Sequence, residues 1–232
     1  MKLKELKETL AYSCNILANE GHWDNILGHV SVRIPKENKI LMKPHSFGFE
    51  EIRPQHIIVV DIESGKKLEG KYERHSEVFI HTEIMKARPD VNCVVHTHPP
   101  YAIAFGSLRQ RLRPVSHEGS IFHEGLPLFD YTTALIRTPE LGKEVAKSLA
   151  KCRGVLMKNH GSTVVGESIE VATLYAVFLE KACRIQLMAT ASGEPSWTSD
   201  EEAPIKFEQI YTPHRLGSMW DYFVRRVRKA RK

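Results

Sequence analysis

The spacing of apolar and polar residues near the start of the chain predicts a helix followed by strands. Apolar residues recur at helical spacing over residues 3–19, and Gly21 follows as a natural C-terminal stop. In residues 28–34, GHVSVRI, apolar and polar residues alternate, which is typical of a half-buried strand. Residues 39–43 and 56–62 are two further strand candidates.

The pattern continues to about residue 191. Residues 76–88, SEVFIHTEIMKAR, are rich in apolar residues and precede Pro89, which predicts a mostly buried helix that ends there. The other predicted elements are a strand over 91–98, a short helix over 99–106, a helix capped by Thr138 and Pro139, two strands around a turn within 154–167, and a helix over about 168–191. No repeat or interior boundary is visible. This order predicts a single α/β domain over residues 1–232, a sandwich with a mixed or antiparallel central sheet.

The composition is that of a soluble globular protein. Of its 232 residues, 42% are hydrophobic and 26% are charged, which are ordinary values. The N-terminal segment lacks the apolar centre and cleavage site of a signal peptide, and no run approaches the roughly 18 apolar residues of a membrane span. We therefore expect a cytoplasmic protein with no membrane partner.

The net charge of +5 comes from one end of the chain. The last eight residues, RRVRKARK, hold six of the 33 Lys and Arg, which leaves 27 basic against 28 acidic residues elsewhere. Such a run is typical of a solvated or frayed end, and contact with RNA or an anionic surface is the less favoured interpretation. We expect a basic C-terminal tail at about 225–232 and no nucleic-acid partner.

Candidate chemistry begins at residues 91–100, VNCVVHTHPP. Residues i and i+2 of a strand share one face and lie about 6.6 Å apart, because each residue adds about 3.3 Å. His96 and His98 can therefore converge on one metal ion, while Thr97 points the other way. The two prolines cannot extend the strand, so it ends where the ligands would be needed. Taken alone, the motif is also compatible with two surface histidines.

Two other segments supply possible partners. KNHG, residues 158–161, places His160 at a turn after an apolar strand, where it could be the third ligand of a catalytic metal with one open position. Glu77 lies at the start of a helix predicted to be buried, where an ionised carboxylate is costly unless it is paired or bound to metal. A first-turn glutamate favoured by the helix dipole explains Glu77 equally well at this point.

These segments together resemble a known family. GHVSVR, then HSEVFIHTEIMKARPDVNCVVHTH, then KNHG is similar to the class II aldolase/adducin family, which includes L-fuculose-phosphate aldolase, L-ribulose-5-phosphate 4-epimerase and several aromatic-acid decarboxylases. The similarity covers about residues 5–190. It implies a three-layer α/β/α sandwich around a nine-stranded, mostly antiparallel sheet, assembled as a C4 homotetramer with active sites at subunit interfaces.

The resemblance also implies the roles of the candidate ligands. His96, His98 and His160 would bind one divalent metal ion per subunit, zinc in the first place, with manganese, cobalt or iron as the other options. Glu77 falls on the family's acid/base glutamate, which can also be a fourth metal ligand. Noncatalytic adducin head domains lack this ligand set, so its presence favours an enzyme.

The expected substrate-binding positions differ from those of the family's sugar-phosphate aldolases. Where those enzymes bind phosphate with GN, TG and SS pairs, small donors have been replaced by imidazoles. The pairs in this chain are Gly28-His29, His45-Ser46 and His75-Ser76. Imidazoles at these places would suit a planar carboxylate, with help from Arg33 or Lys43.

One further position distinguishes this chain from the aldolases. Their tyrosine proton donor, supplied by the neighbouring subunit, corresponds here to His117, which could instead be a structural interface histidine. The phrases GHVSVRIP, IHTEIMKARPDV and LRPVSHEG are closest to the family's decarboxylase branch.

The sequence therefore predicts a metal-dependent carbon–carbon lyase. The leading interpretation is a decarboxylase of a hydroxylated aromatic or other hydroxy-carboxylic acid. The metal would stabilise the carbanion as an enediolate or phenolate, and Glu77 or His117 would deliver a proton as CO2 leaves. The alternative is an aldolase or 4-epimerase acting on a ketose or ketose phosphate. A different class is a noncatalytic, adducin-like scaffold that uses the basic tail.

Overall fold

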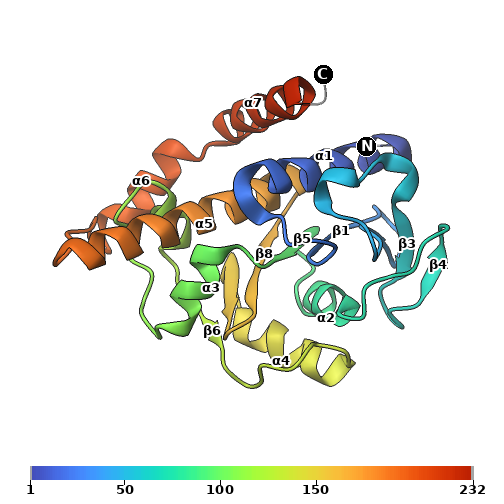
Figure 1. Cartoon of the computed structure of the whole chain (residues 1–232), viewed down its shortest axis with the longest axis horizontal. Coiled ribbons are helices and arrows are strands. Elements are labelled where there is room, and N and C mark those ends of the chain that lie inside the picture. The colour runs from blue at the N-terminus through green and yellow to red at the C-terminus, as the bar shows by residue number, and fades with distance from the viewer. Residues whose placement is uncertain (1, 231–232) are drawn as a thin grey trace.

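The computed structural model describes residues 2–230 and has three layers (Figure 1). Eight strands within these residues form one sheet in the order β4-β3-β2-β1-β5-β8-β7-β6. Every neighbouring pair is antiparallel except β6 with β7. The strands are β1 (His29–Arg33), β2 (Lys39–Met42), β3 (Ile58–Asp61), β4 (Lys67–Glu69), β5 (Cys93–Thr97), β6 (Leu128–Phe129), β7 (Gly154–Met157) and β8 (Gly161–Gly166).

Helices cover both faces of the sheet. The α-helices are α1 (Leu3–Leu17), α2 (Val78–Ala87), α3 (Pro100–Ser107), α4 (Pro139–Leu149), α5 (Ile169–Ser192), α6 (Glu202–Ile210) and α7 (Pro213–Ala230). Shorter turns of helix are η1 (Ala18–His22), η2 (Phe49–Glu51), η3 (Pro54–His56) and η4 (Glu118–Phe122). Figure 1 shows α1 and α5 on one side of the sheet and α2 and α4 on the other.

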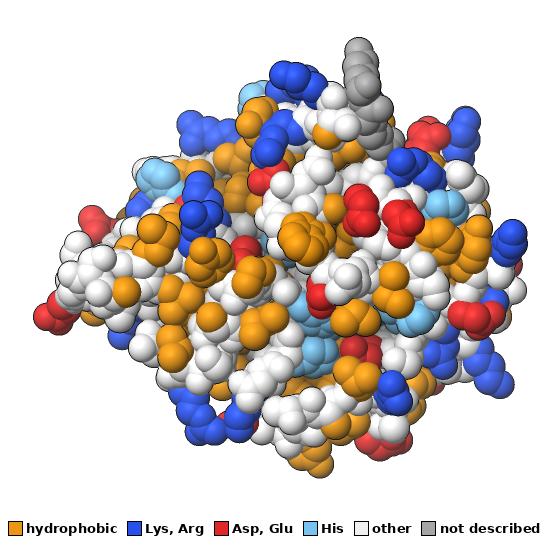
Figure 2. Space-filling view, in the orientation of Figure 1, with side chains coloured by type: hydrophobic (Ala, Val, Ile, Leu, Met, Phe, Trp, Pro, Cys, Tyr) orange, Lys and Arg blue, Asp and Glu red, His pale blue; other side chains and the backbone are white. Residues whose placement is uncertain are grey.

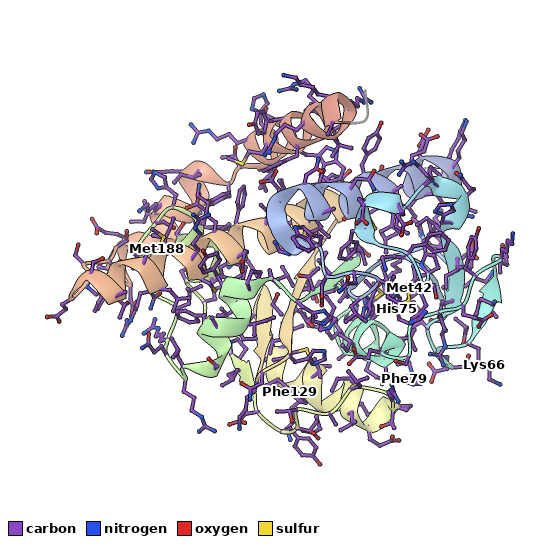
Figure 3. The ribbon with its side chains drawn as sticks, in the orientation of Figure 1. Met42, Lys66, His75, Phe79, Phe129 and Met188 are labelled. Atoms are coloured by element: carbon purple, nitrogen blue, oxygen red, sulfur yellow. The ribbon has the colours of Figure 1, made fainter. Side chains whose placement is uncertain are left out.

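Alternate side chains of each strand pack into two separate hydrophobic cores. Val95 on β5 belongs to the core under α1, α3 and α5, whereas its neighbour Val94 belongs to the core under α2 and α4. The second core reaches from Met42 on β2 to Phe129 on β6 (Figure 3). The α/β/α sandwich with a mostly antiparallel sheet is therefore confirmed. The sheet has eight strands within residues 2–230, not the nine that the family resemblance implied.

The prediction that β1 is half-buried is wrong. Val30 and Val32 face the first core, as the alternation predicts, but His29 and Ser31 on the other face are 2% and 0% exposed. The physical reason is that α2 lies over this polar face. A polar stripe that reads as solvent-facing in the sequence thus becomes an internal layer of imidazoles and hydroxyls.

The basic C-terminal segment is also not the frayed end that its charge predicts. Arg225–Ala230 form the last turns of α7, which packs on α1 and α5; residues 231 and 232 lie outside the described part of the chain. Phe223, Val224 and Val227 are buried on one face of α7, and the basic side chains occupy the other. This apolar spacing, i, i+1 and i+4, was a helical signal that the charge run obscured. Between residues 2 and 230, no helix is both long and apolar enough to cross a membrane.

Thr82 on α2 tests whether a buried polar group without a partner destabilises the fold. Its side chain is fully buried and its Oγ1 finds no hydrogen-bond partner among residues 2–230, which normally costs stability. We expect Thr82→Val to raise the free energy of unfolding by about 1 kcal/mol, measured by urea denaturation. A loss of stability of that size would show that the hydroxyl has a partner.

Candidate metal centre and active site

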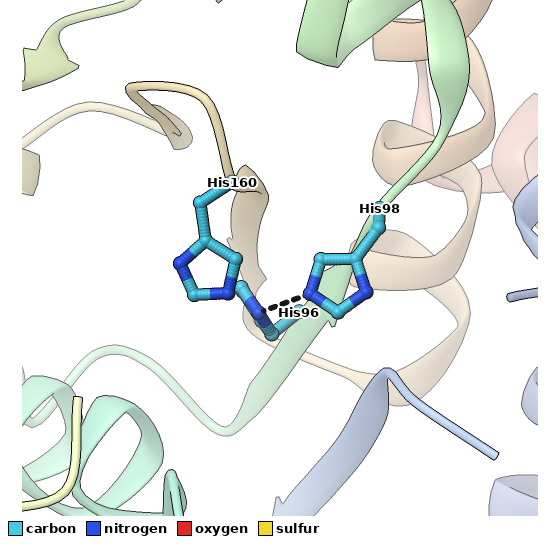
Figure 4. A group of neighbouring side chains, drawn as sticks. All are labelled: His96, His98 and His160. Atoms are coloured by element: carbon cyan, nitrogen blue, oxygen red, sulfur yellow. Dashed lines mark hydrogen bonds between the residues drawn. The ribbon is translucent and has the colours of Figure 1, made fainter. Parts of the chain in front are cut away.

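Three histidines from two segments meet at the edge of the sheet (Figure 4). His96 is on β5, His98 directly follows it, and His160 lies in the turn between β7 and β8. Their ring centroids are 4.8 to 5.1 Å apart, and the Nε2 atoms of His96 and His98 are separated by 3.0 Å. Gly161 permits the close approach of the two segments, because a Cβ there would meet His98 Cδ2 at 2.7 Å and the carbonyl of Thr97.

Hydrogen bonds at the far side of two rings fix which nitrogen faces the centre. His96 Nδ1 lies 3.0 Å from Thr163 Oγ1, and His98 Nδ1 lies 3.0 Å from Asp24 Oδ2. A carboxylate accepts, so His98 donates from Nδ1. The Thr163 hydroxyl donates its hydrogen to Met157 Sδ at 3.5 Å, so it accepts from His96 Nδ1. Both Nε2 atoms then present lone pairs toward one point.

This donor set fits a divalent metal ion. Burial holds the pKa of His96 well below its ordinary value, and burial together with the charge of His160 lowers the pKa of His98 against the opposing effect of Asp24. Both rings are therefore neutral at pH 7. Two lone pairs 3.0 Å apart repel each other unless a cation lies between them, and nitrogens on one tetrahedral zinc ion are about 3.3 Å apart.

Glu77 is placed beside these ligands by the start of α2. Its Oε1 accepts a hydrogen bond from the amide of Ile136 at 2.8 Å, and its Oε2 lies 3.6 Å from His160 Nε2. Burial acts to raise the pKa of Glu77, but His160 and the Ile136 amide outweigh it, so the pKa lies below its ordinary value. The residue is thus a carboxylate with one oxygen, Oε2, free for a ligand or a proton.

A cavity of about 360 Å³ opens in front of the metal centre. Besides Glu77 and two of the three ligands, four residues that the sequence predicted as substrate-binding line it: His29, His45, His75 and Ser76. Figure 2 shows histidine side chains gathered in the middle of this face of the molecule, next to acidic side chains. The imidazoles are in mutual contact, since the ring centroid of His29 lies 4.5 Å from that of His75 and 4.9 Å from that of His96.

Arg33 and Lys43 do not line this cavity, contrary to prediction. Arg33 reaches under α2 and donates from Nη2 to the carbonyl of Met85, one of the groups that a helix end leaves without partners. Lys43 has no exposed surface; its Nζ donates to the carbonyl of Ile26 and lies 3.3 Å from His75 Nε2. Burial lowers the pKa of Lys43 to about 8. Arg33 therefore supports α2, and Lys43 supports the loops behind His75.

Ser46 and His117 also lie outside the cavity of their own chain. Ser46 is exposed at a positive φ of 70°, and its Oγ is 2.6 Å from His45 Nδ1, so it orients a residue that does line the cavity. His117 precedes η4 and is exposed. Its predicted role in a neighbouring subunit stays a prediction.

Several residues of the site were missed by the sequence reasoning. Asp24, Thr163 and His81 orient imidazoles, and Arg137 brings an exposed guanidinium to the cavity. Only His81 carried a usable signal, because it is a polar residue that directly follows an apolar run in a helix predicted to be mostly buried.

Comparisons with known proteins agree with this geometry. Residues 8–187 match the family model described as the class II aldolase and adducin N-terminal domain, and the chain belongs to this family. It is 34% identical over 197 residues to the decarboxylase NovR of Streptomyces niveus, covering 84% of this chain and 71% of the relative. It is 32% identical to a 3,4-dihydroxyphthalate decarboxylase of Arthrobacter keyseri, covering 81% and 79%.

Solved structures give the same fold. The L-fuculose 1-phosphate aldolase from Glaciozyma antarctica PI12 superimposes with a TM-score of 0.86 at 26% identity, covering 98% of this chain and 90% of that one. The named relatives thus include both decarboxylases and an aldolase, which are carbon–carbon lyases.

Replacing one ligand tests the metal centre. We expect His98→Ala to reduce bound zinc from one ion per chain to a trace after dialysis, measured by elemental analysis, because two nitrogens do not complete the site. His214→Ala, which removes an exposed histidine on α7, is the matched control and should keep its zinc. Stoichiometric zinc in His98→Ala would exclude this ligand set.

Asp24 tests the orientation of the ligands separately from their number. Asp24→Asn leaves all three histidines in place but weakens the acceptor for His98 Nδ1. We expect zinc affinity to fall by about 10- to 100-fold, measured by competition with a chelating dye. Unchanged affinity would mean that Asp24 does not fix the His98 ring.

Proposed function

We propose that this protein is a divalent-metal-dependent carbon–carbon lyase, and that it removes CO2 from a hydroxylated aromatic carboxylic acid. The observation that carries the proposal is the combination of a three-histidine candidate metal centre with three further imidazoles, those of His29, His45 and His75, in the lining of the same cavity. The decarboxylase relatives support the same choice. We propose zinc as the ion and a homotetramer as the assembly.

His96, His98 and His160 would hold the ion. When bound, a divalent ion supplies positive charge that stabilises the oxyanion developing as the carbon–carbon bond breaks. The remaining work falls to groups of the protein. They must bind the carboxylate, exclude water from the ring carbon and move one proton.

Glu77 is suited to the proton transfer. Its Oε1 is held by the Ile136 amide, so Oε2 is the atom that can accept the proton of a substrate hydroxyl and return it to the ring carbon. The bond between the ring carbon and the carboxylate carbon breaks, and its electron pair remains on the ring carbon. The ring carbon takes the proton as CO2 leaves. The product oxyanion regains its proton from water.

The histidine-lined wall of the cavity is suited to the carboxylate. His29, His45 and His75 line the cavity, with the ring of His29 next to that of His96, and Arg137 adds a positive charge to the lining. A guanidinium binds a carboxylate with two parallel hydrogen bonds, and an imidazole with a free N–H donates one more. Leu27, Ile103 and Leu135 provide apolar walls against which an aromatic ring can pack.

Aldol cleavage is the second candidate. The resemblance to a fuculose-phosphate aldolase at a TM-score of 0.86 favours it, and the same metal centre would serve that reaction. The distinguishing experiment incubates zinc-loaded protein with a panel of dihydroxybenzoates, dihydroxyphthalates and ketose phosphates, and records CO2 and aldehyde separately. We expect CO2 from an aromatic acid. Aldehyde from a ketose phosphate, with no CO2 from any acid, would reverse the order.

His117 tests the contribution of a second subunit. We propose that His117 reaches the cavity of a neighbouring chain as a proton donor, because it is exposed and does not line the candidate active-site cavity of its own chain. His117→Ala should then lower turnover by about 10²- to 10⁴-fold without loss of zinc, measured with the substrate identified by the panel. His214→Ala is again the control. Full activity would remove His117 from the reaction.

A further inference from the structure

A chain of three side chains leads away from the cavity into the protein. His29 Nδ1 lies 2.6 Å from Nε2 of His81, and His81 Nδ1 lies 2.7 Å from Oγ of Ser31. His29 and Ser31 come from the same face of β1, and His81 comes from the middle of α2 directly above them. The metal centre does not use His81 or Ser31, and neither residue lines the cavity.

The three side chains are shielded from solvent. His81 and Ser31 have no exposed surface and His29 is 2% exposed. His29 Nδ1 and His81 Nε2 lie 2.6 Å apart, so one of these nitrogens donates and the other accepts. The tautomer of each ring therefore depends on the hydrogen bond at the other end of His81.

The requirement that buried hydrogens find acceptors gives the direction of donation along Ser31, His81 and His29. Among the described residues, the one hydrogen bond of the Ser31 hydroxyl is to His81 Nδ1. If Ser31 accepted there, its own hydrogen would be buried without an acceptor, which is costly. Ser31 therefore donates to His81 Nδ1, so His81 holds its proton on Nε2 and donates to His29 Nδ1. The remaining proton of His29 is then on Nε2.

From this geometry we infer that Ser31 and His81 are positioning residues, which hold His29 in the tautomer that presents an Nε2–H donor to the cavity. Such a donor recognises an anionic oxygen of the substrate. The identity of that oxygen as a carboxylate rests on the proposed function, whereas the direction of the chain does not.

The inference also separates two candidate ligand sets. His29, Glu77 and His96 offer atoms close enough together to hold an ion, as do His96, His98 and His160. A metal ligand must present a lone pair. His29 could present one at Nε2 only if the hydrogen bonds to His81 and Ser31 reversed, which would leave the buried Ser31 hydrogen without an acceptor. His29 is thereby reserved for the substrate, and the metal is left to the second set.

Neutron diffraction from deuterium-exchanged crystals of the whole protein tests the direction without any variant. We expect deuterium on Nε2 of both His29 and His81, and the Ser31 deuterium directed at His81 Nδ1. Deuterium on Nδ1 of His29 would overturn the inference, whatever reaction the protein performs.

A binding measurement tests the consequence. Zinc-loaded wild type, Ser31→Ala and Thr82→Val are titrated by calorimetry with 2,3-dihydroxybenzoate and with catechol, which lacks the carboxylate. Ser31→Ala should weaken binding of the acid by about three- to tenfold and leave catechol unchanged, because one hydrogen bond that selects the tautomer is lost. Thr82→Val removes a buried hydroxyl that has no partner and should change neither.

The outcomes separate the two proposals. Equal weakening of both compounds, or no change in either, would contradict the positioning role of Ser31. If neither compound binds the wild type, the proposed aromatic-acid substrate is contradicted, and the neutron map alone decides the direction of the chain.

Discussion

The site depends on two imidazole nitrogens 3.0 Å apart, and the hydrogen bonds on the far side of each ring leave no proton between them. Thr163 and Asp24 hold the protons of His96 and His98 on the opposite side of each ring, and burial keeps both rings neutral. Such an arrangement is repulsive by itself and becomes favourable around a cation. The antiparallel pairing of β5 with β8 imposes the constraint, because it places Thr163 directly beside His96.

The same sheet face supplies the rest of the site. β1 lies on the other side of β5, and its register pairs His29 with His96, so that hydrogen-bond donors and acceptors line up across three strands. The helix α2 covers this face and contributes His81, while Glu77 stands at its first turn. The cavity therefore brings a candidate cation site next to hydrogen-bond donors that suit an anion. An aromatic ring that carries both hydroxyls and a carboxylate would match the two.

Much of the candidate metal centre could be predicted from the sequence, because its histidines lie in short local motifs. A strand that ends on His96 and His98, and a turn that presents His160, need only strand geometry to bring ligands together. The helices up to residue 192 and the buried start of α2 followed from apolar spacing, and the family resemblance implied the three layers. The family resemblance added the role of Glu77.

The residues that orient the ligands could not be predicted in this way, because their partners are distant in the chain. Asp24 acts on a histidine 74 positions away, and His81 acts on one 52 positions away. Arg33 was misplaced for the same reason: the alternation of β1 gives its face, but only the position of α2 shows that backbone carbonyls take up its guanidinium. The α7 helix was not predicted because basic residues separate the few apolar residues of the face by which it packs.

Anomalous X-ray diffraction at the zinc edge, from crystals grown with zinc, tests the central claim most directly. The account predicts one strong peak per chain, bonded to Nε2 of His96 and to His98 and His160 at about 2.0 to 2.1 Å. A peak held by His29, Glu77 and His96 in its place, or no peak near His98, would contradict it.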